Sequence, residues 1–366
     1  MGGVPAAAGE AYDVLVLGEV LVEIHAGTPL RDAADGTPAR ISYSGDALNA
    51  AAAAVAAGAR TALLAVVGED ELSTPLLARA AELGVDVSHV RRSPRPNGAY
   101  LLSADTEGDR AFVYWRTGSA GSTLSVEHVE SWRELLTGCK ALITSGITGA
   151  LSPGSRDAVL AAAQTVHASG GHLSYDPNFR SRLTSRDEAR ELLARVAPLT
   201  GLLKTSCPAD ALAMVDTDDQ AEAAVRYRAL GARSVVVTAG ADRLLLSDGT
   251  VDGTPGGAVH GAPGRTDRRT AATAYLPVPV NGDPVDATGA GDCFTGTTTA
   301  RLALGDTLAD AVAYGMAAAS LSVSGRGGTG RVPAFSETAA LAAAHRSGRV
   351  GRTTGKAPGP SPRSGS

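Results

Sequence analysis

The sequence contains few cysteines, few lysines and few aromatic residues, and each shortage excludes a class of protein. Three widely spaced cysteines among 366 residues provide neither a disulfide framework nor a zinc quartet, which fits a reducing compartment. Only three lysines are present, arginine carries nearly all the positive charge, and the net charge is −5. Phosphate contacts need clustered Lys and Arg side chains, so we expect no nucleic-acid partner.

Long apolar runs are also missing. A membrane-spanning helix needs a run of about eighteen apolar residues, and the Ala-rich stretch 50–57 is too short and too weakly apolar. Residues 1–10 lack a basic segment followed by an apolar core, so we expect no secretory signal. We therefore expect a cytoplasmic protein without a membrane partner, long enough for one large α/β domain or two small ones.

Apolar runs alternate with helix-forming segments along most of the chain. We expect strands at 12–17, 61–67, 140–145, 172–176, 202–205 and 234–238, and helices at 46–58, 75–83, 156–169, 186–196 and 221–230. Alternation at this spacing favours an α/β fold with a mostly parallel sheet and helices on both faces.

Three segments depart from this alternation. Residues 98–104 and 111–116 alternate like an antiparallel pair around the polar turn 105–110, which predicts a small projecting β lid. Segment 251–275 is rich in Gly, Pro and Arg and has no apolar period, so we expect a mobile insertion. The tail 351–366 lacks aliphatic and aromatic anchors and is expected to be disordered.

The most informative stretch is Asp286-Ala-Thr-Gly-Ala-Gly-Asp292, between an expected strand at 275–280 and an Ala-rich helix ending near 304. Small residues at a strand-to-helix junction let backbone N–H groups converge on an anion, and the helix N-terminus favours negative charge. A carboxylate at that place, Asp292, suits a general base for an attacking hydroxyl. The alternative is an ordinary helix-capping aspartate.

This segment resembles the C-terminal signature of the ribokinase-like (PfkB) sugar kinases. The resemblance implies that Asp292 deprotonates the sugar hydroxyl and that the amides of Gly289, Ala290 and Gly291 form the anion hole. The N-terminal signature of that family is also present, as Ser44-Gly-Asp-Ala-Leu-Asn49 followed by Gly58 and Gly68. By the same resemblance, Gly45, Asp46 and Asn49 hold sugar hydroxyls.

The resemblance covers roughly residues 12–335. It implies a ribokinase-like three-layer sandwich, which we expect to be a single kinase domain over 12–345. The β lid would then come from about 19–43 and 97–118.

The hairpin bears on the substrate class. The strand period of two places Tyr114 and Arg116 on one face, and a guanidinium suits bidentate binding of a carboxylate. The alternative is a solvated surface arginine. The stretch resembles the Tyr-x-Arg segment of 2-keto-3-deoxygluconate kinases, which implies that Tyr100, Tyr114 and Arg116 meet the substrate. Asp176-Pro-Asn-Phe-Arg180 is similar to another segment of those kinases and implies the same for Arg180, whose alternative role is a salt bridge at a helix start.

For the nucleotide, the resemblance implies contacts from the strand ends and from the anion-hole loop. The residues expected to bind it are Ser206, Thr238, Gly240, Asp286 and Thr288. The family usually has Asn and Glu, three apart, to order magnesium and its waters, where this chain has Ser206 and Ala209, with Asp210 one place later. ATP and Mg²⁺ are the expected cofactors, and no metal-ligating cluster of protein side chains is expected.

Together these patterns predict an ATP-dependent kinase for a sugar acid, most similar to 2-keto-3-deoxygluconate kinases. Three alternatives stay open. The first is a kinase for fructose, ribose or a nucleoside such as adenosine, and the second is a sugar- or nucleotide-binding regulator in which the changes at Ser206 and Ala209 have impaired catalysis. The third is a tailoring kinase acting on a specialised metabolite, which the long insertion suggests. Exposed lid edges tend to pair, which is compatible with a homodimer through the hairpins.

Overall fold

The structure is a computed structural model that describes residues 11–104, 110–249, 272–279 and 282–348. The predicted insertion at 251–275 lies outside these residues except for its last four positions, and the predicted disordered tail lies outside them altogether.

A central sheet forms the middle layer of the fold. Its strands are β1 (Val14–Leu17), β4 (Thr61–Leu64), β9 (Ala141–Ser145), β10 (His172–Asp176), β11 (Leu202–Ser206), β12 (Ser234–Ala239), β13 (Arg243–Asp248) and β14 (Ala272–Pro277). They lie in the order β14-β13-β12-β11-β10-β9-β1-β4. The six strands from β12 to β4 pair in parallel, whereas β13 and β14 add to the edge in antiparallel register. The predicted mostly parallel sheet is confirmed.

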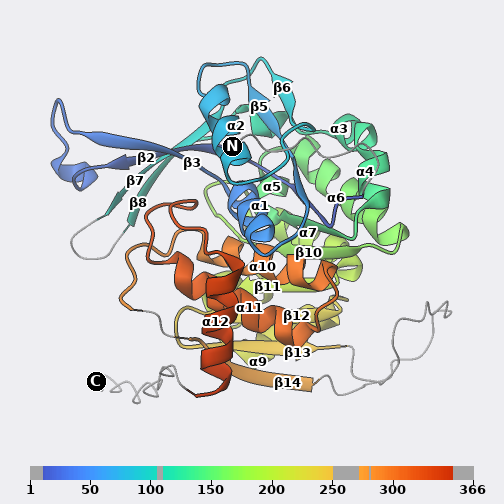
Figure 1. Cartoon of the computed structure of the whole chain (residues 1–366). Helices are drawn as coiled ribbons and strands as arrows, with labels where there is room; N and C mark the ends of the chain where they lie inside the picture. The colour runs from blue at the N-terminus through green and yellow to red at the C-terminus, as the bar shows by residue number, and fades with distance from the viewer. Residues whose placement is uncertain (1–10, 105–109, 250–271, 280–281, 349–366) are drawn as a thin grey trace, which may run out of the picture.

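Helices cover both faces of this sheet (Figure 1). One layer contains α1 (Asp46–Ala56), α2 (Ser73–Glu82), α10 (Ala290–Ala303), α11 (Leu308–Ser322) and α12 (Phe335–Arg346). The other contains α3 (Val126–Ser131), α4 (Arg133–Gly138), α5 (Gly146–Ala150), α6 (Pro153–Ala168), α7 (Arg186–Val196), α8 (Ala209–Val215) and α9 (Gln220–Ala229). Alternate residues of β1 face the two helix layers. Leu15 and Leu17 pack against the layer that contains α6, and Val14 and Val16 pack against the layer that contains α1.

A second sheet extends from the body of the molecule (Figure 1). It consists of β2 (Leu21–Ala26), β3 (Ala39–Ser44), β7 (Gly98–Ala104) and β8 (Arg110–Trp115), in the order β3-β2-β7-β8. The predicted antiparallel pairing of 98–104 with 111–116 is confirmed by β7 and β8. We call these four strands the lid sheet.

Two expected strands have different bounds in the structure. The apolar run 61–67 is divided into β4 and β5 (Val66–Gly68), and β5 pairs with β6 (Arg91–Ser93) in a separate small sheet. The run is apolar throughout, so its hydrophobic pattern does not indicate the residue at which β4 ends and the chain leaves the main sheet. The strand expected at 275–280 is β14, which begins at Ala272, inside the segment predicted to be an insertion, because pairing with β13 orders alanines of weak strand propensity.

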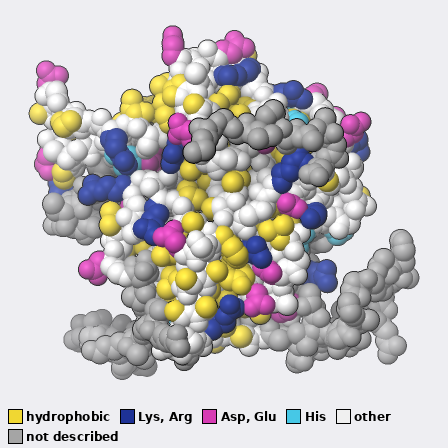
Figure 2. Space-filling view, in the orientation of Figure 1, with side chains coloured by type: hydrophobic (Ala, Val, Ile, Leu, Met, Phe, Trp, Pro, Cys, Tyr) yellow, Lys and Arg dark blue, Asp and Glu magenta, His cyan; other side chains and the backbone are white. Residues whose placement is uncertain are grey.

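On the face shown in Figure 2, basic and acidic side chains are interspersed. Within the described part of the chain, no helix combines the length and apolar character that crossing a bilayer requires.

Candidate active site

The carboxyl ends of the parallel strands open onto a cavity of about 570 Å³ below the lid sheet. Most of the residues singled out from the sequence line it: Gly45, Asp46, Asn49, Tyr100, Tyr114, Arg116, Arg180, Ser206, Thr288, Gly289, Gly291 and Asp292. Residues 247 positions apart in the chain, Gly45 and Asp292, therefore share one cavity. This is the edge of an open α/β sheet at which ligands bind.

Helix α10 begins at this cavity. Its N-cap is Gly289, whose φ of +78° favours glycine, and Ala290 is its first residue. A side chain at Gly45, where φ is +122°, would place its Cβ 2.5 Å from the carbonyl oxygen of Glu19. A Cβ at Gly289 would likewise lie 2.9 Å from the carbonyl oxygen of Gly328, so glycine at both positions lets neighbouring backbone segments pack closely around the cavity. The N-terminus of α10 favours an anion there.

The Asp292 carboxylate is half-buried in the first turn of α10. It does not cap the helix; instead its Oδ2 accepts a hydrogen bond of 2.9 Å from the side-chain amide of Asn49. Burial and the nearby Asp46 raise the pKa of Asp292 to about 7. A carboxylate with this pKa can accept a proton from a hydroxyl near neutral pH.

Asp46, in the first turn of α1, provides a second carboxylate in the cavity wall. The Ser145 hydroxyl donates to its Oδ2, while Oδ1 is buried and has no hydrogen-bond partner among the described residues. Burial raises the pKa of Asp46. A buried acceptor without a donor is costly, and a ligand hydroxyl would satisfy it.

The lid sheet contributes aromatic side chains from its inner face. Tyr114 lies opposite Tyr100 in the β7–β8 register, and their ring centroids are 6.1 Å apart. The Tyr100 hydroxyl donates to the buried carboxylate of Glu23, which also accepts from Ser42 and hydrogen-bonds His25. Tyr114 and Arg116 line the cavity while Trp115 is exposed, so the predicted division of the hairpin into two faces is confirmed.

Arg116 has a partner that sequence reasoning missed. Its guanidinium forms a buried ion pair with Glu19, through both Nε and Nη2. The alternative of a solvated surface arginine is therefore wrong, and the guanidinium expected to meet the substrate is shared with a buried carboxylate. Arg180, in contrast, is exposed at the mouth of the cavity, where its Nη1 donates to the carbonyl oxygen of Phe179. Both arginines also line an adjoining cavity of about 280 Å³.

The residues expected to bind nucleotide are only partly brought together. Ser206 lines the main cavity, and its hydroxyl donates to Asp210 Oδ2 at 2.7 Å. Asp210 thus places a carboxylate beside Ser206 in the cavity, although it is one position later in the chain than Ala209, where the family usually has Glu. Thr238 pairs with Ser206 across β11 and β12 but does not line the cavity, and Gly240 follows it in a turn with φ of +58°.

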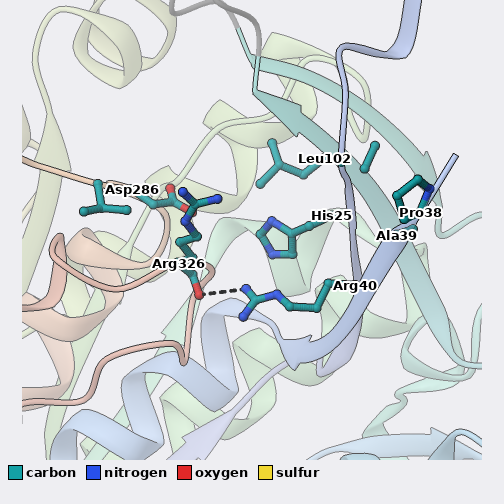
Figure 3. Close-up of a pocket in the computed structure, with 10 residues that line it drawn as sticks. His25, Pro38, Ala39, Arg40, Leu102, Asp286 and Arg326 are labelled. Atoms are coloured by element: carbon teal, nitrogen blue, oxygen red, sulfur yellow. Dashed lines mark hydrogen bonds between the residues drawn. The ribbon is translucent and has the colours of Figure 1, made fainter. Parts of the chain in front are cut away.

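Asp286 lies outside the main cavity. Its Oδ2 accepts from the Gly327 amide at 2.8 Å, and its Oδ1 accepts from the Thr288 amide at 2.9 Å. It lines a second cavity of about 530 Å³ together with His25, Arg40 and Arg326 (Figure 3). Asp286 therefore shapes the loop that leads into α10.

Lys204 is the functional candidate that sequence reasoning missed most clearly. It lies in β11, lines the main cavity, is 7% exposed and donates to Asp176 Oδ2 at 2.8 Å. The signal was present in the sequence: a lysine, rare in this chain, inside the apolar run Leu202-Leu203-Lys204. A buried charge in such a strand indicates a partner or a function.

The cavity combines a carboxylate of raised pKa, buried acceptors for hydroxyl groups and a helix N-terminus suited to an anion. Phosphoryl transfer to an alcohol needs these three elements. The fold and the site therefore define a phosphotransferase of the α/β class.

The comparisons with known proteins give the family. The model of the pfkB family carbohydrate kinases matches residues 12–334, and the chain belongs to that family. It is 31% identical over 238 residues to the 2-dehydro-3-deoxygluconokinase of Thermoproteus tenax, covering 63% of this chain and 70% of the relative. It is 29% identical over 293 residues to the enzyme of the same name from Bacillus subtilis, covering 79% and 83%. A putative ribokinase II from E. coli, crystallised with ATP and Mg²⁺, superposes with a TM-score of 0.75 at 25% identity over 90% of this chain and 98% of that one. The expected ribokinase-like fold is confirmed.

Proposed function

We propose that this carbohydrate kinase transfers the γ-phosphoryl group of ATP to a hydroxyl of a sugar acid. The favoured acceptor is 2-keto-3-deoxygluconate, also called 2-dehydro-3-deoxygluconate, and the product is its 6-phosphate. The observation that carries the proposal is Asp292, a carboxylate with a pKa near 7 at the helix start where phosphate charge would collect.

The proposed reaction uses the chain's own groups in order. The substrate hydroxyl gives its proton to Asp292, its oxygen bonds to the γ-phosphorus, and the bond from that phosphorus to the β,γ-bridging oxygen breaks to release ADP. Amides of Gly289, Ala290 and Gly291 would stabilise the charge of the transferring group. Gly45, Asp46 and Asn49 would hold sugar hydroxyls, and closure of the lid sheet would exclude water as a competing acceptor.

Magnesium fits the residues present. Mg²⁺ usually keeps several waters and binds through substrate phosphates and one or two carboxylates. Asp210 supplies a carboxylate in the cavity beside Ser206, and the described residues hold no larger His, Cys, Asp and Glu cluster for a metal. Ser206 and Asp210 would hold the ion with ATP in place of the usual Asn and Glu, and the ion would supply positive charge to offset that of the phosphates.

Recognition of a carboxylate is the finer part of the proposal. Arg116 is held in place by Glu19, and Arg180 stands beside it with its guanidinium at the cavity mouth. Tyr114, in β8 of the lid sheet, lines the same adjoining cavity, and the Arg116 guanidinium is 5.6 Å from its ring centroid. We expect Arg180 to supply the charge that meets the substrate carboxylate, in the geometry favoured by guanidinium groups.

The test is ADP release with ATP and Mg²⁺ across 2-keto-3-deoxygluconate, gluconate, fructose, ribose and adenosine. We expect turnover of the keto-deoxy acid. The variant Arg180→Ala should raise KM for the sugar acid about tenfold or more, since a hydrogen bond to a charged group contributes about 1.5–3 kcal/mol. The matched control is Arg133→Ala, an exposed arginine of α4 that pairs with Glu130. Turnover of neutral sugars only would refute the carboxylate assignment, and ATP binding without any turnover would favour the regulator.

The homodimer through the lid belongs to the same proposal. The outer face of the lid sheet carries an apolar row in register, Ile41, Ile24, Leu101 and Val113, with Trp115 beside it. Ile41 and Trp115 are 55% and 54% exposed, so a second copy packing on this face would bury them. We expect Trp115→Lys to shift sedimentation toward the monomer, whereas the control Val225→Lys on α9, also exposed, leaves it unchanged. A monomeric wild-type protein at micromolar concentration would refute the dimer.

A further inference from the structure

Lys204 is a buried cation that the reaction described above does not use. Its ammonium group is held by Asp176, at the end of the neighbouring strand β10, and both side chains are less than a tenth exposed. Although burial alone would lower the pKa of Lys204, the Asp176 carboxylate raises it, so the group stays protonated. A buried ion pair is weak evidence for a gain in stability, because apolar residues of similar volume do as well or better. The pair therefore calls for a functional reason.

The position of the ammonium supplies that reason. A Cβ added at Gly291, the second residue of α10, would lie 2.6 Å from Lys204 Nζ. The ammonium is thus packed against the turn of backbone that forms the anion cradle. It lines the same cavity as Asp292 and is attracted electrostatically to Asp292 and Asp210. The bond to Asp176 uses one of its three N–H donors, and the others can reach a ligand.

We propose that Lys204 is a catalytic residue that contacts the phosphoryl group during its transfer, and that Asp176 is the positioning residue that aims it. The proposal rests on the kinase reaction proposed above and adds a side-chain cation to its backbone amides. Lys204 keeps its proton throughout, because Asp292 takes the hydroxyl proton. Its charge acts on the equatorial oxygens of the transferring group, where negative charge spreads in the transition state.

The first experiment compares Lys204→Met with wild type in the ADP-release assay. Removing one preorganised donor from a transition-state charge typically lowers kcat about a hundredfold to a thousandfold. We expect that loss here, with Lys204→Arg recovering part of it. The matched control is Lys140→Met, whose lysine is 56% exposed and pairs with Asp13 at the surface. A fall in kcat of less than tenfold for Lys204→Met would overturn the proposal.

A double variant separates catalysis from folding. Lys204→Met leaves Asp176 as an unpaired buried carboxylate, so a lower melting temperature is expected for that reason alone. Lys204→Met/Asp176→Asn removes both charges and should recover the melting temperature. We expect its kcat to stay low, because the cation is still missing. Recovery of kcat together with stability would show that Lys204 only neutralises Asp176 and would overturn the proposal.

Two further measurements test the contact itself. Titration calorimetry with Mg²⁺ should show that Lys204→Met weakens ATP binding at least fivefold more than ADP binding, since only ATP carries the group that Lys204 meets. Lys204 also lowers the pKa of Asp292, against the raising effects of burial, Asp46 and Asp176. The pH of half-maximal kcat should therefore move upward in the variant. An unchanged ATP-to-ADP ratio would refute the contact even if no sugar is phosphorylated, so this failure is distinct from that of the proposed acceptor.

Discussion

The variant Asp292→Asn should lose activity and gain stability, and the two effects have the same electrostatic origin. A pKa raised from 3.8 to about 7 means that the folded protein favours the neutral form of this side chain. The ionised form therefore opposes folding, and the opposition grows as pH rises from about 4 to about 7. Asparagine is neutral at every pH and can still accept the hydrogen bond from Asn49.

The expected gain in the free energy of unfolding follows from the shift in the pKa of Asp292. About three pK units correspond to about 4 kcal/mol at 1.36 kcal/mol per unit. Asp292 is half-buried rather than fully buried, so we halve this value for solvent screening and expect a gain of about 2 kcal/mol at pH 8. At pH 4 the gain should almost vanish, because Asp292 of the folded wild-type protein is then protonated and as neutral as the asparagine of the variant.

Urea denaturation of both proteins at pH 4, 6 and 8 measures this gain directly. The activity assay should show a loss of about 10²-fold to 10⁴-fold in kcat for Asp292→Asn. Wild-type kcat should rise with pH through about 7, because only the ionised carboxylate accepts the proton. An activity loss accompanied by an equal loss of stability at pH 8 would refute the reasoning, since it would identify Asp292 as a structural residue.

Two further variants test the lid and the packing of α10. Although burial alone would raise the pKa of Glu23, hydrogen bonds from His25 and Tyr100 lower it to about 2, so its contribution to stability is present above about pH 4.5 and disappears as pH falls toward 2. Glu23→Gln should cost about 3 kcal/mol at pH 7 and almost nothing at pH 2 in urea denaturation, and a cost independent of pH would contradict this account. Gly296→Ala would place a Cβ against the carbonyl oxygen of Ala50 in α1, and overpacking of this kind costs about 1–3 kcal/mol. The control Gly138→Ala meets no atom within 4 Å, so equal melting temperatures for the two variants would refute the packing argument.

Sequence reasoning located those parts of the site whose pattern is local, that is, contained within a single short segment of the chain. Gly289, Gly291 and Asp292 follow one another at a strand-to-helix junction, so their local pattern predicts both their backbone geometry and their place at the cavity. The alternation in 112–116 likewise predicts which side chains of the hairpin face inward, because the strand period is fixed by backbone geometry.

Pairings between distant segments were not accessible in the same way. Glu19 meets Arg116 across 97 positions, and Tyr100 meets Glu23 across 77. No local period links such residues, and their partners become visible only when β2 and β7 pair in the lid sheet. Reasoning from Arg116 alone therefore weighed only a substrate carboxylate or solvent as its partner, and the buried carboxylate of Glu19 was not foreseen.

The lid sheet and the anion cradle are joined through one loop. The Gly327 amide donates to Asp286, which precedes the cradle, and the neighbouring Gly328 amide donates to Glu23 in the lid sheet. Glu23 in turn holds Tyr100, a residue of the cavity wall. A displacement of the lid sheet must therefore stretch contacts that also fix Asp286, because both carboxylates share adjacent amides of the same loop. This loop therefore links the lid sheet to the loop that precedes α10, so a substrate that drew Tyr100 inward would also act on the backbone that we propose receives the phosphoryl group.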